Sequence, residues 1–101
     1  MSSLLIWKYV ALNTYIEEIN YILLKWNNKE VQKFKDLVVE NLERLSKNPK
    51  MGVYLEKDNI YYLMISKQTT LYYKVSENDQ RIDLLVFWNN QKNPDDLIKL
   101  L

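Results

Sequence analysis

The chain has 101 residues, of which 48% are hydrophobic, so we expect one folded domain spanning residues 1–101. It contains no cysteine and no histidine. This excludes disulfides, thiolate or imidazole metal sites and histidine-based catalysis, and no metal or cofactor is expected. Its 14 basic and 13 acidic residues give a formal net charge of +1, which is too balanced to predict direct sequence-specific DNA binding.

Nothing in the sequence predicts insertion into a membrane. Its longest apolar runs are about five residues, whereas a membrane-spanning helix needs roughly 20. Lys8 lies where a signal peptide would keep its apolar stretch, and the start of the chain is not basic. We therefore expect a cytoplasmic protein.

The first elements are a strand and a helix. Residues 4–7 (LLIW) are short, bulky and apolar, which is typical of a strand. From about Ala11 the apolar residues follow a helical period, and the stripe consists of Tyr15, Ile16, Ile19, Ile22, Leu23 and Trp26. Thr14 and Glu17 have the spacing of a capping box, with a helix start nearer Tyr9 as the alternative. Because Trp26 continues the stripe, we expect it in the core.

A second helix follows after a short break. Asn27 and Glu30 have the spacing of a helix start. The apolar stripe of this helix consists of Val31, Phe34, Val38, Leu42 and Leu45. Pro49 disfavours a helical Asn48 and ends the helix. Two helices joined by so short a break are expected to lie antiparallel, as a hairpin.

After Pro49 the pattern changes to that of strands, which we expect at residues 52–55, 60–66, 70–75 and 82–88. The turns between the last three are short and polar, which predicts an antiparallel meander. The nearly continuous apolar character of 82–88 predicts a central strand covered on one face by the helices. The expected fold class is therefore α+β, in the order β-α-α-β-β-β-β, with the helix hairpin packed on a mostly antiparallel sheet.

The C-terminal residues predict a short final helix. Asn93 is a favourable cap, Pro94 suits the first helical position, and Asp95 and Asp96 face the positive end of the helix dipole. A helix of this length is marginal unless it docks on the rest of the protein.

Four stretches occur in an order that is similar to a known family. They are Ala11, Tyr15, Ile19 and Tyr21-Ile22; residues 45–52 (LSKNPKMG); Ile65-Ser66-Lys67 followed by residues 71–75 (LYYKV); and residues 87–94 (FWNNQKNP). These stretches resemble the motifs A-x-x-x-L…I-x-YI, L-x-x-x-P-x-x-G, ISK…LYYRV and F-F/W-D-N-R-Q-N-P. The chain thus resembles the RelE/ParE superfamily of type II toxin–antitoxin toxins over almost its whole length.

The resemblance implies a small toxin, of the kind found in plasmid stabilization systems, that is neutralised by a cognate antitoxin. It implies one of two activities. RelE-like members cleave mRNA on the ribosome, whereas ParE-like members poison DNA gyrase.

The basic residues favour the ParE-like activity. Ribonuclease action without histidine needs several cations around the developing charge, and losing one costs roughly 3–4 kcal/mol. The candidates for a nuclease site are scattered over different elements: Lys67, Lys74, Arg81 and Lys92. Thr70 stands where similar nucleases tend to carry arginine, and no tyrosine follows Tyr73. We therefore expect a gyrase inhibitor, with the ribosome-dependent mRNA endonuclease as the alternative.

The residues after the last strand are candidates for target binding: Trp88, Asn89, Asn90, Gln91 and Lys92. This is where the chain departs from the family motif, since Gln91 replaces Arg and Asn89 replaces Asp. Lys92 supplies a cation one residue later. The loss of the arginine leaves a third alternative, an antitoxin-binding module without toxicity.

Several other residues have structural explanations. Tyr61, Tyr62, Tyr72 and Tyr73 are better explained by cross-strand packing than by a base-stacking platform. Trp88 fits the core and an interface equally well, and Lys74 and Asp83 are expected as charges on the sheet.

Overall fold

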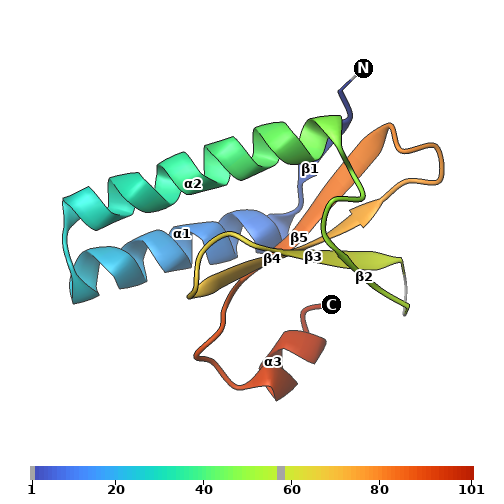
Figure 1. Ribbon diagram of the computed structural model, residues 1–101. Coiled ribbons are helices and arrows are strands. Elements are labelled where there is room, and N and C mark those ends of the chain that lie inside the picture. The colour runs from blue at the N-terminus through green and yellow to red at the C-terminus, as the bar shows by residue number, and fades with distance from the viewer. Residues whose placement is uncertain (1, 57–58) are drawn as a thin grey trace.

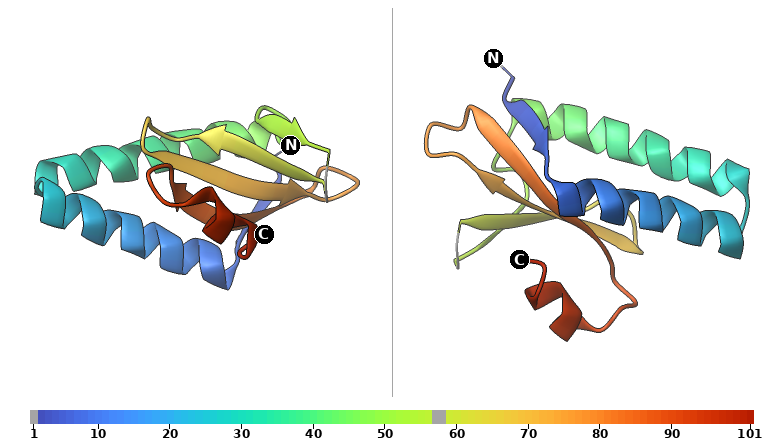
Figure 2. Two further views of the ribbon diagram at one scale, coloured as in Figure 1. Left: turned by 90° about the horizontal axis from the view of Figure 1, so that it is seen from below. Right: turned by 180° about the vertical axis from the view of Figure 1, so that it is seen from behind.

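The computed structural model describes residues 2–56 and 59–101, and it has two long helices on one face of a sheet and a short helix on the other (Figures 1 and 2). In chain order the elements are β1 (Leu4–Trp7), α1 (Tyr9–Lys25), α2 (Asn28–Lys47), β2 (Val53–Leu55), β3 (Ile60–Met64), β4 (Thr69–Val75), β5 (Arg81–Asn89) and α3 (Pro94–Ile98). The α+β class, the order of elements and the short C-terminal helix are confirmed.

The sheet has the strand order β1-β5-β4-β3-β2. Strands β3 to β5 form the predicted antiparallel meander, and β2 adds to it antiparallel to β3. Strand β1 pairs with β5 in parallel, with Leu5 opposite Ile82. Strand β5 therefore has neighbours on both sides, as its apolar sequence predicted.

A bulge in β5 explains why its sequence does not alternate. Tyr73 pairs with Leu84 and Tyr72 pairs with Val86, so Leu85 is the extra residue. Leu84 and Phe87 both belong to the core under the helices. Val86 and Trp88 are buried too, although they point to the opposite face, where α3 lies.

Helix α1 does not begin at the predicted capping box. It starts at Tyr9, and its N-cap residue Lys8 makes no side-chain cap. Thr14 instead lies inside the helix, where its Oγ1 donates to the carbonyl of Val10 at 2.6 Å and accepts from the Phe87 N–H at 2.9 Å. The alternative start near Tyr9 is confirmed, and the capping box does not form because Thr14 lies inside the helix and its hydroxyl bonds α1 to β5.

The buried face of α1 is also rotated from the predicted stripe. It consists of Ala11, Thr14, Glu18 and Ile22, whereas Ile16 and Leu23 are exposed. Trp26 is 44% exposed, so its predicted core position was wrong. The helix ends at Lys25, and Trp26 caps it rather than continuing its face.

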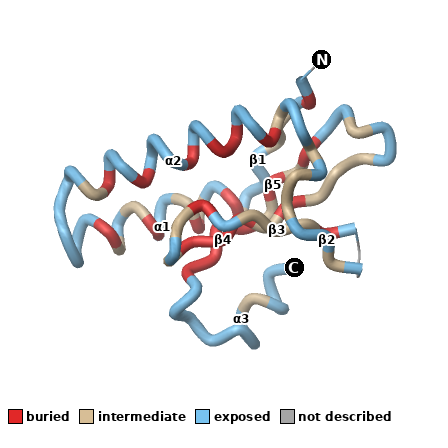
Figure 3. The backbone as a smooth tube through the Cα atoms, viewed as in Figure 1, coloured by how far each residue is buried: buried red, intermediate tan, exposed pale blue. Residues whose placement is uncertain are grey.

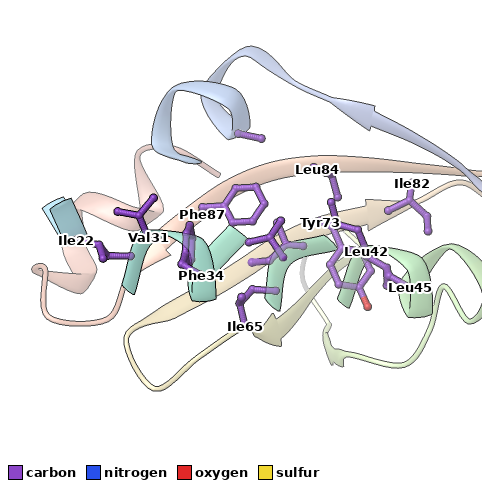
Figure 4. Packing of buried hydrophobic residues seen from close by; sticks show 13 residues of the cluster. Ile22, Val31, Phe34, Leu42, Leu45, Ile65, Tyr73, Ile82, Leu84 and Phe87 are labelled. Atoms are coloured by element: carbon purple, nitrogen blue, oxygen red, sulfur yellow. The ribbon is translucent and has the colours of Figure 1, made fainter. Parts of the chain in front are cut away.

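Helix α2 follows the sequence prediction. Asn27 Oδ1 accepts from the Glu30 N–H at 3.0 Å, and the helix stops two residues before Pro49. All five residues of the predicted apolar stripe are buried. Buried positions recur along α2 (Figure 3), and their side chains fill the core between the hairpin and the sheet (Figure 4).

Aromatic side chains connect the layers. The ring of Phe87 lies 5.4 Å from that of Tyr15 of α1, and Tyr15 stacks on Phe34 of α2 at 5.8 Å. On the sheet, Tyr61 pairs with Tyr73 at 5.5 Å and Tyr62 with Tyr72 at 5.8 Å. Cross-strand packing of the four tyrosines is therefore confirmed.

Gly52 is required by a close approach to Tyr73. The Gly52 N–H donates to the Tyr73 hydroxyl at 3.0 Å, and Tyr73 is fully buried. Burial raises the pKa of Tyr73 to about 12, although the hydrogen bond from Gly52 opposes the shift. The hydroxyl thus stays neutral around physiological pH and holds the segment before β2 against the sheet.

Replacing Gly52 with alanine is expected to destabilise the protein by about 1–3 kcal/mol, the cost of overpacking a close contact. The added Cβ would lie 2.5 Å from the Tyr62 carbonyl oxygen and 2.5 Å from the Tyr73 hydroxyl. Urea unfolding followed by circular dichroism measures the change. Combining Gly52→Ala with Tyr73→Phe removes one of the two clashes, so a less-than-additive loss is expected. A stability equal to that of the wild type in Gly52→Ala would contradict the close approach.

Candidate functional site

The candidate target-binding residues lie where β5 ends and the chain turns toward α3 (Figure 1). We call residues 88–92 the β5 rim. At the rim, the end of β5 meets the β3–β4 turn on one side and the C-terminal half of α1 on the other.

Asn90 has a structural role in the rim. Its Oδ1 accepts from the Thr70 hydroxyl at 2.8 Å, and its Nδ2 donates to the carbonyl of Lys67 at 3.2 Å. Its backbone N–H donates to the carbonyl of Gln68 at 2.7 Å. Asn90 therefore ties the end of β5 to the β3–β4 turn.

Trp88 and Asn89 are both buried, at 6% and 5% exposure. The two interpretations of Trp88 are thus decided in favour of packing within the chain. The Lys92 ammonium lies 5.9 Å from the centre of its ring, within the range of a cation–π contact. Asn89 Oδ1 accepts from the Gln91 N–H at 2.9 Å, which shapes the turn.

Gln91 and Lys92 are exposed and face α1. Gln91 Oε1 accepts from the Tyr21 hydroxyl at 3.0 Å, and that hydroxyl accepts from Lys25 Nζ at 3.1 Å. Lys92 Nζ lies 3.7 Å from Glu17 Oε2. Gln91 and Lys92 therefore connect the rim to α1 while their side chains remain exposed.

A polar pocket of about 370 Å³ lies between α1 and the rim, and it is lined by Glu17, Glu18, Tyr21, Asn89, Gln91 and Lys92. Glu18 is the residue that sequence reasoning missed. It is only 3% exposed, and its Oε2 accepts from the Thr69 hydroxyl at 2.5 Å. A signal was present, because position 18 is four residues after Thr14 and four before Ile22, on the buried face of α1.

The four cations of the alternative nuclease site lie in two pairs. Lys74 and Arg81 are near one end of the β4–β5 ladder, while Lys67 and Lys92 flank its other end. Seven residues of β4 span about 20 Å, which separates the pairs by roughly that distance. Arg81 Nε lies 3.3 Å from Asp83 Oδ1, and Lys74 is the cross-strand neighbour of Asp83, as expected for charges on the sheet.

A second, more apolar pocket of about 450 Å³ lies at the turn of the helix hairpin. It is lined by Ile22, Trp26, Glu30, Lys33, Phe34, Leu37 and residues 66–68. Trp26 lies edge-on to Tyr21 at 6.4 Å, and its ring is 5.0 Å from Lys25 Nζ. Its exposure therefore places a large aromatic surface beside this pocket.

Residues 2–56 and 59–101 offer neither a metal site nor a membrane-spanning helix. These residues contain no cluster of three or more acidic side chains suited to holding a metal ion. No helix in the same ranges is long and apolar enough to cross a membrane.

No family model matches the sequence, and no curated protein matches it. Solved structures do match the fold. A chromosomal ParDE toxin–antitoxin system from P. aeruginosa superposes with a TM-score of 0.71 at 14% identity, covering 87% of this chain and 96% of that one. The RelBE toxin–antitoxin complex of Mycobacterium tuberculosis has a TM-score of 0.61 at 14% identity, covering 89% and 100% of the two chains.

A mutant of the E. coli toxin RelE in the free state is also similar. Its TM-score is 0.62 at 13% identity, and the match covers 98% of this chain and 93% of that one. The fold that the sequence motifs implied is therefore confirmed.

Asn90 and Lys92 are neighbouring rim residues that should contribute differently to stability. Asn90→Ala is expected to lower the free energy of unfolding by about 1–2 kcal/mol, because it removes two side-chain hydrogen bonds and leaves their partners unpaired. Lys92→Ala is expected to change it by less than about 0.5 kcal/mol, since Lys92 and Glu17 are both largely exposed. Urea unfolding compares the two variants. Equal effects would show that Asn90 does not tie β5 to the turn.

Proposed function

We propose that this chain, which has the fold of the RelE/ParE toxins, is the toxin of a type II toxin–antitoxin system. Its target is DNA gyrase, as for ParE-like toxins, and it is neutralised by a cognate antitoxin. The observation that supports gyrase over RNA is the separation of Lys74 and Arg81 from Lys67 and Lys92 at opposite ends of the sheet.

Cleavage of RNA requires charges that converge on one phosphate. A phosphorane-like transition state is stabilised by cations within a few ångströms of it, and a distant cation contributes little in water. Two of the four cations also form ion pairs within the chain, Arg81 with Asp83 and Lys92 with Glu17. This arrangement supports inhibition by binding rather than by catalysis.

Binding to gyrase would use the accessible part of the β5 rim. Gln91 and Lys92 are exposed, and Asn90 holds the turn in place. A rim whose backbone is tied to two elements presents these side chains in a defined geometry, which lowers the entropic cost of association.

Purified protein is expected to inhibit supercoiling by gyrase at micromolar concentration. Lys92→Glu is expected to raise the concentration needed by about tenfold, because a rim charge then opposes the contact. Lys99→Glu, a charge reversal at the exposed residue that follows α3, serves as the control.

Three results would contradict inhibition of gyrase or favour one of the alternative functions. A supercoiling activity unaffected by micromolar protein would contradict the proposal. Cuts in translated mRNA, detected by primer extension, would favour the endonuclease instead. Normal growth on expression without a partner would favour a non-toxic antitoxin-binding module.

Neutralisation would use the apolar pocket at the helix hairpin turn. Antitoxin segments that fold on binding commonly insert apolar side chains of an amphipathic helix into such grooves. Trp26, Phe34 and Leu37 supply the apolar wall, and Trp26 is a typical binding hot spot.

With the product of the neighbouring reading frame as partner, Trp26→Ala is expected to weaken binding at least 30-fold, the loss typical of a hot spot. Isothermal titration calorimetry measures the affinity. Leu24→Ala is the matched control, because Leu24 is 89% exposed on the same helix but does not line the pocket. Equal losses in both variants would place the antitoxin elsewhere on the chain.

A further inference from the structure

Glu18 is an acidic side chain placed among the buried residues of α1. Its only hydrogen bond within residues 2–56 and 59–101 comes from the Thr69 hydroxyl, and no lysine or arginine of these residues approaches its carboxylate within 4 Å. Burying a carboxylate is costly unless a cation or several donors compensate it. The second oxygen, Oε1, thus retains its full capacity to accept.

Four of the six residues that line the pocket beside Glu18 carry carboxylate or amide oxygens, and the Lys92 ammonium in the same lining pairs with Glu17. Gln91 Oε1 already accepts from Tyr21, and Asn89 Oδ1 accepts from the Gln91 N–H. The pocket of about 370 Å³ therefore places the Glu18 carboxylate beside two amide side chains, with no cation paired to it among the described residues. It is matched to a ligand that brings donors and positive charge.

We propose that this pocket receives an arginine side chain from a protein partner, with the guanidinium paired to the Glu18 carboxylate. The planar guanidinium carries five N–H donors, so it can donate hydrogen bonds to the carboxylate and to a neighbouring amide oxygen at the same time. An ammonium is a compact and strongly hydrated charge that is poorer at this task. The identification of the partner as the antitoxin rests on the proposed function. The expectation of an arginine rests only on the chemistry of the pocket.

The charges around the pocket favour an arginine carried by a polypeptide over a free small cation. Glu17 and Glu18 are balanced by Lys25 and Lys92, so little long-range attraction draws a free ion in. An arginine on a partner that is already bound through another surface has a high effective concentration at the pocket. The apolar pocket at the hairpin turn provides such a second surface on the same helix.

Gln91 makes the proposal testable from within the chain. It lines the pocket and carries no charge, so an arginine at this position would place a guanidinium near Glu18 in the absence of any partner. Gln91→Arg is expected to raise the thermal unfolding midpoint by about 5 °C in the wild type and to leave it unchanged in Glu18→Gln. Glu18→Gln is nearly isosteric and keeps an acceptor for Thr69. An equal shift in both backgrounds would overturn the proposal.

Direct binding is measured with N-acetyl-L-argininamide in two-dimensional ¹H–¹⁵N NMR titrations of the full chain. Saturable shifts are expected at the amides of Glu18, Tyr21, Asn89 and Gln91, and they should disappear in both Glu18→Gln and Gln91→Arg. The neutral citrulline analogue is the matched probe and should bind at least tenfold more weakly. Equal binding of the two probes, or unchanged binding to Glu18→Gln, would overturn the proposal.

These measurements use neither gyrase nor antitoxin, so their outcome is independent of the proposed function. The source of the arginine is then tested with the neighbouring gene product. If the antitoxin supplies it, Gln91→Arg weakens the complex at least tenfold, whereas Leu24→Ala does not. An unchanged affinity in Gln91→Arg would overturn the antitoxin as the source.

Discussion

The packing of α1 across β5 is the contact on which the rest of the structure depends. Phe87 donates its backbone N–H to the hydroxyl of Thr14 within the buried layer, and Ala11 has no exposed surface at all. Small side chains let the helix approach the strand closely, and the hydroxyl satisfies an N–H that the sheet would otherwise leave buried and unpaired. Because β5 also pairs with β1 and β4, this contact orients both layers.

The bulge at Leu85 determines which face of the sheet each side chain at the end of β5 occupies. One extra residue changes which side chains face the helices, so Phe87 and Asn89 lie under α1 while Val86 and Trp88 lie on the other face. Asn89 consequently reaches the pocket beside Glu18 rather than solvent. In the rim that follows, Asn90, Gln91 and Lys92 are exposed, and the side chain of Asn90 holds the β3–β4 turn.

The two pockets at this end of the molecule have different chemistry. The pocket at the hairpin turn has an apolar wall, and the pocket at the rim surrounds a buried carboxylate. Both are bordered by the last turns of α1, so a partner that covers this end of the helix can reach both. The partner that we propose would need an apolar helix face and a neighbouring arginine to fill both pockets. The cations at the far end of the sheet take no part in this surface.

The sequence by itself determined the elements, their order and the whole of α2, because each follows from local periodicity and turn chemistry. Asn27, Pro49 and Asn93 act on residues a few positions away, and the buried face of α2 is apolar except for Asn41. Only the tertiary structure decided the buried face of α1, since Thr14 and Glu18 are polar residues whose burial depends on Phe87 and Thr69, more than 50 residues distant. The position of Trp26 was decided in the same way, since the rotation of α1 on β5 moves the buried face away from it. Buried polar groups that are satisfied across elements do not appear in a stripe of apolar residues, and the candidate site is built almost entirely from such groups.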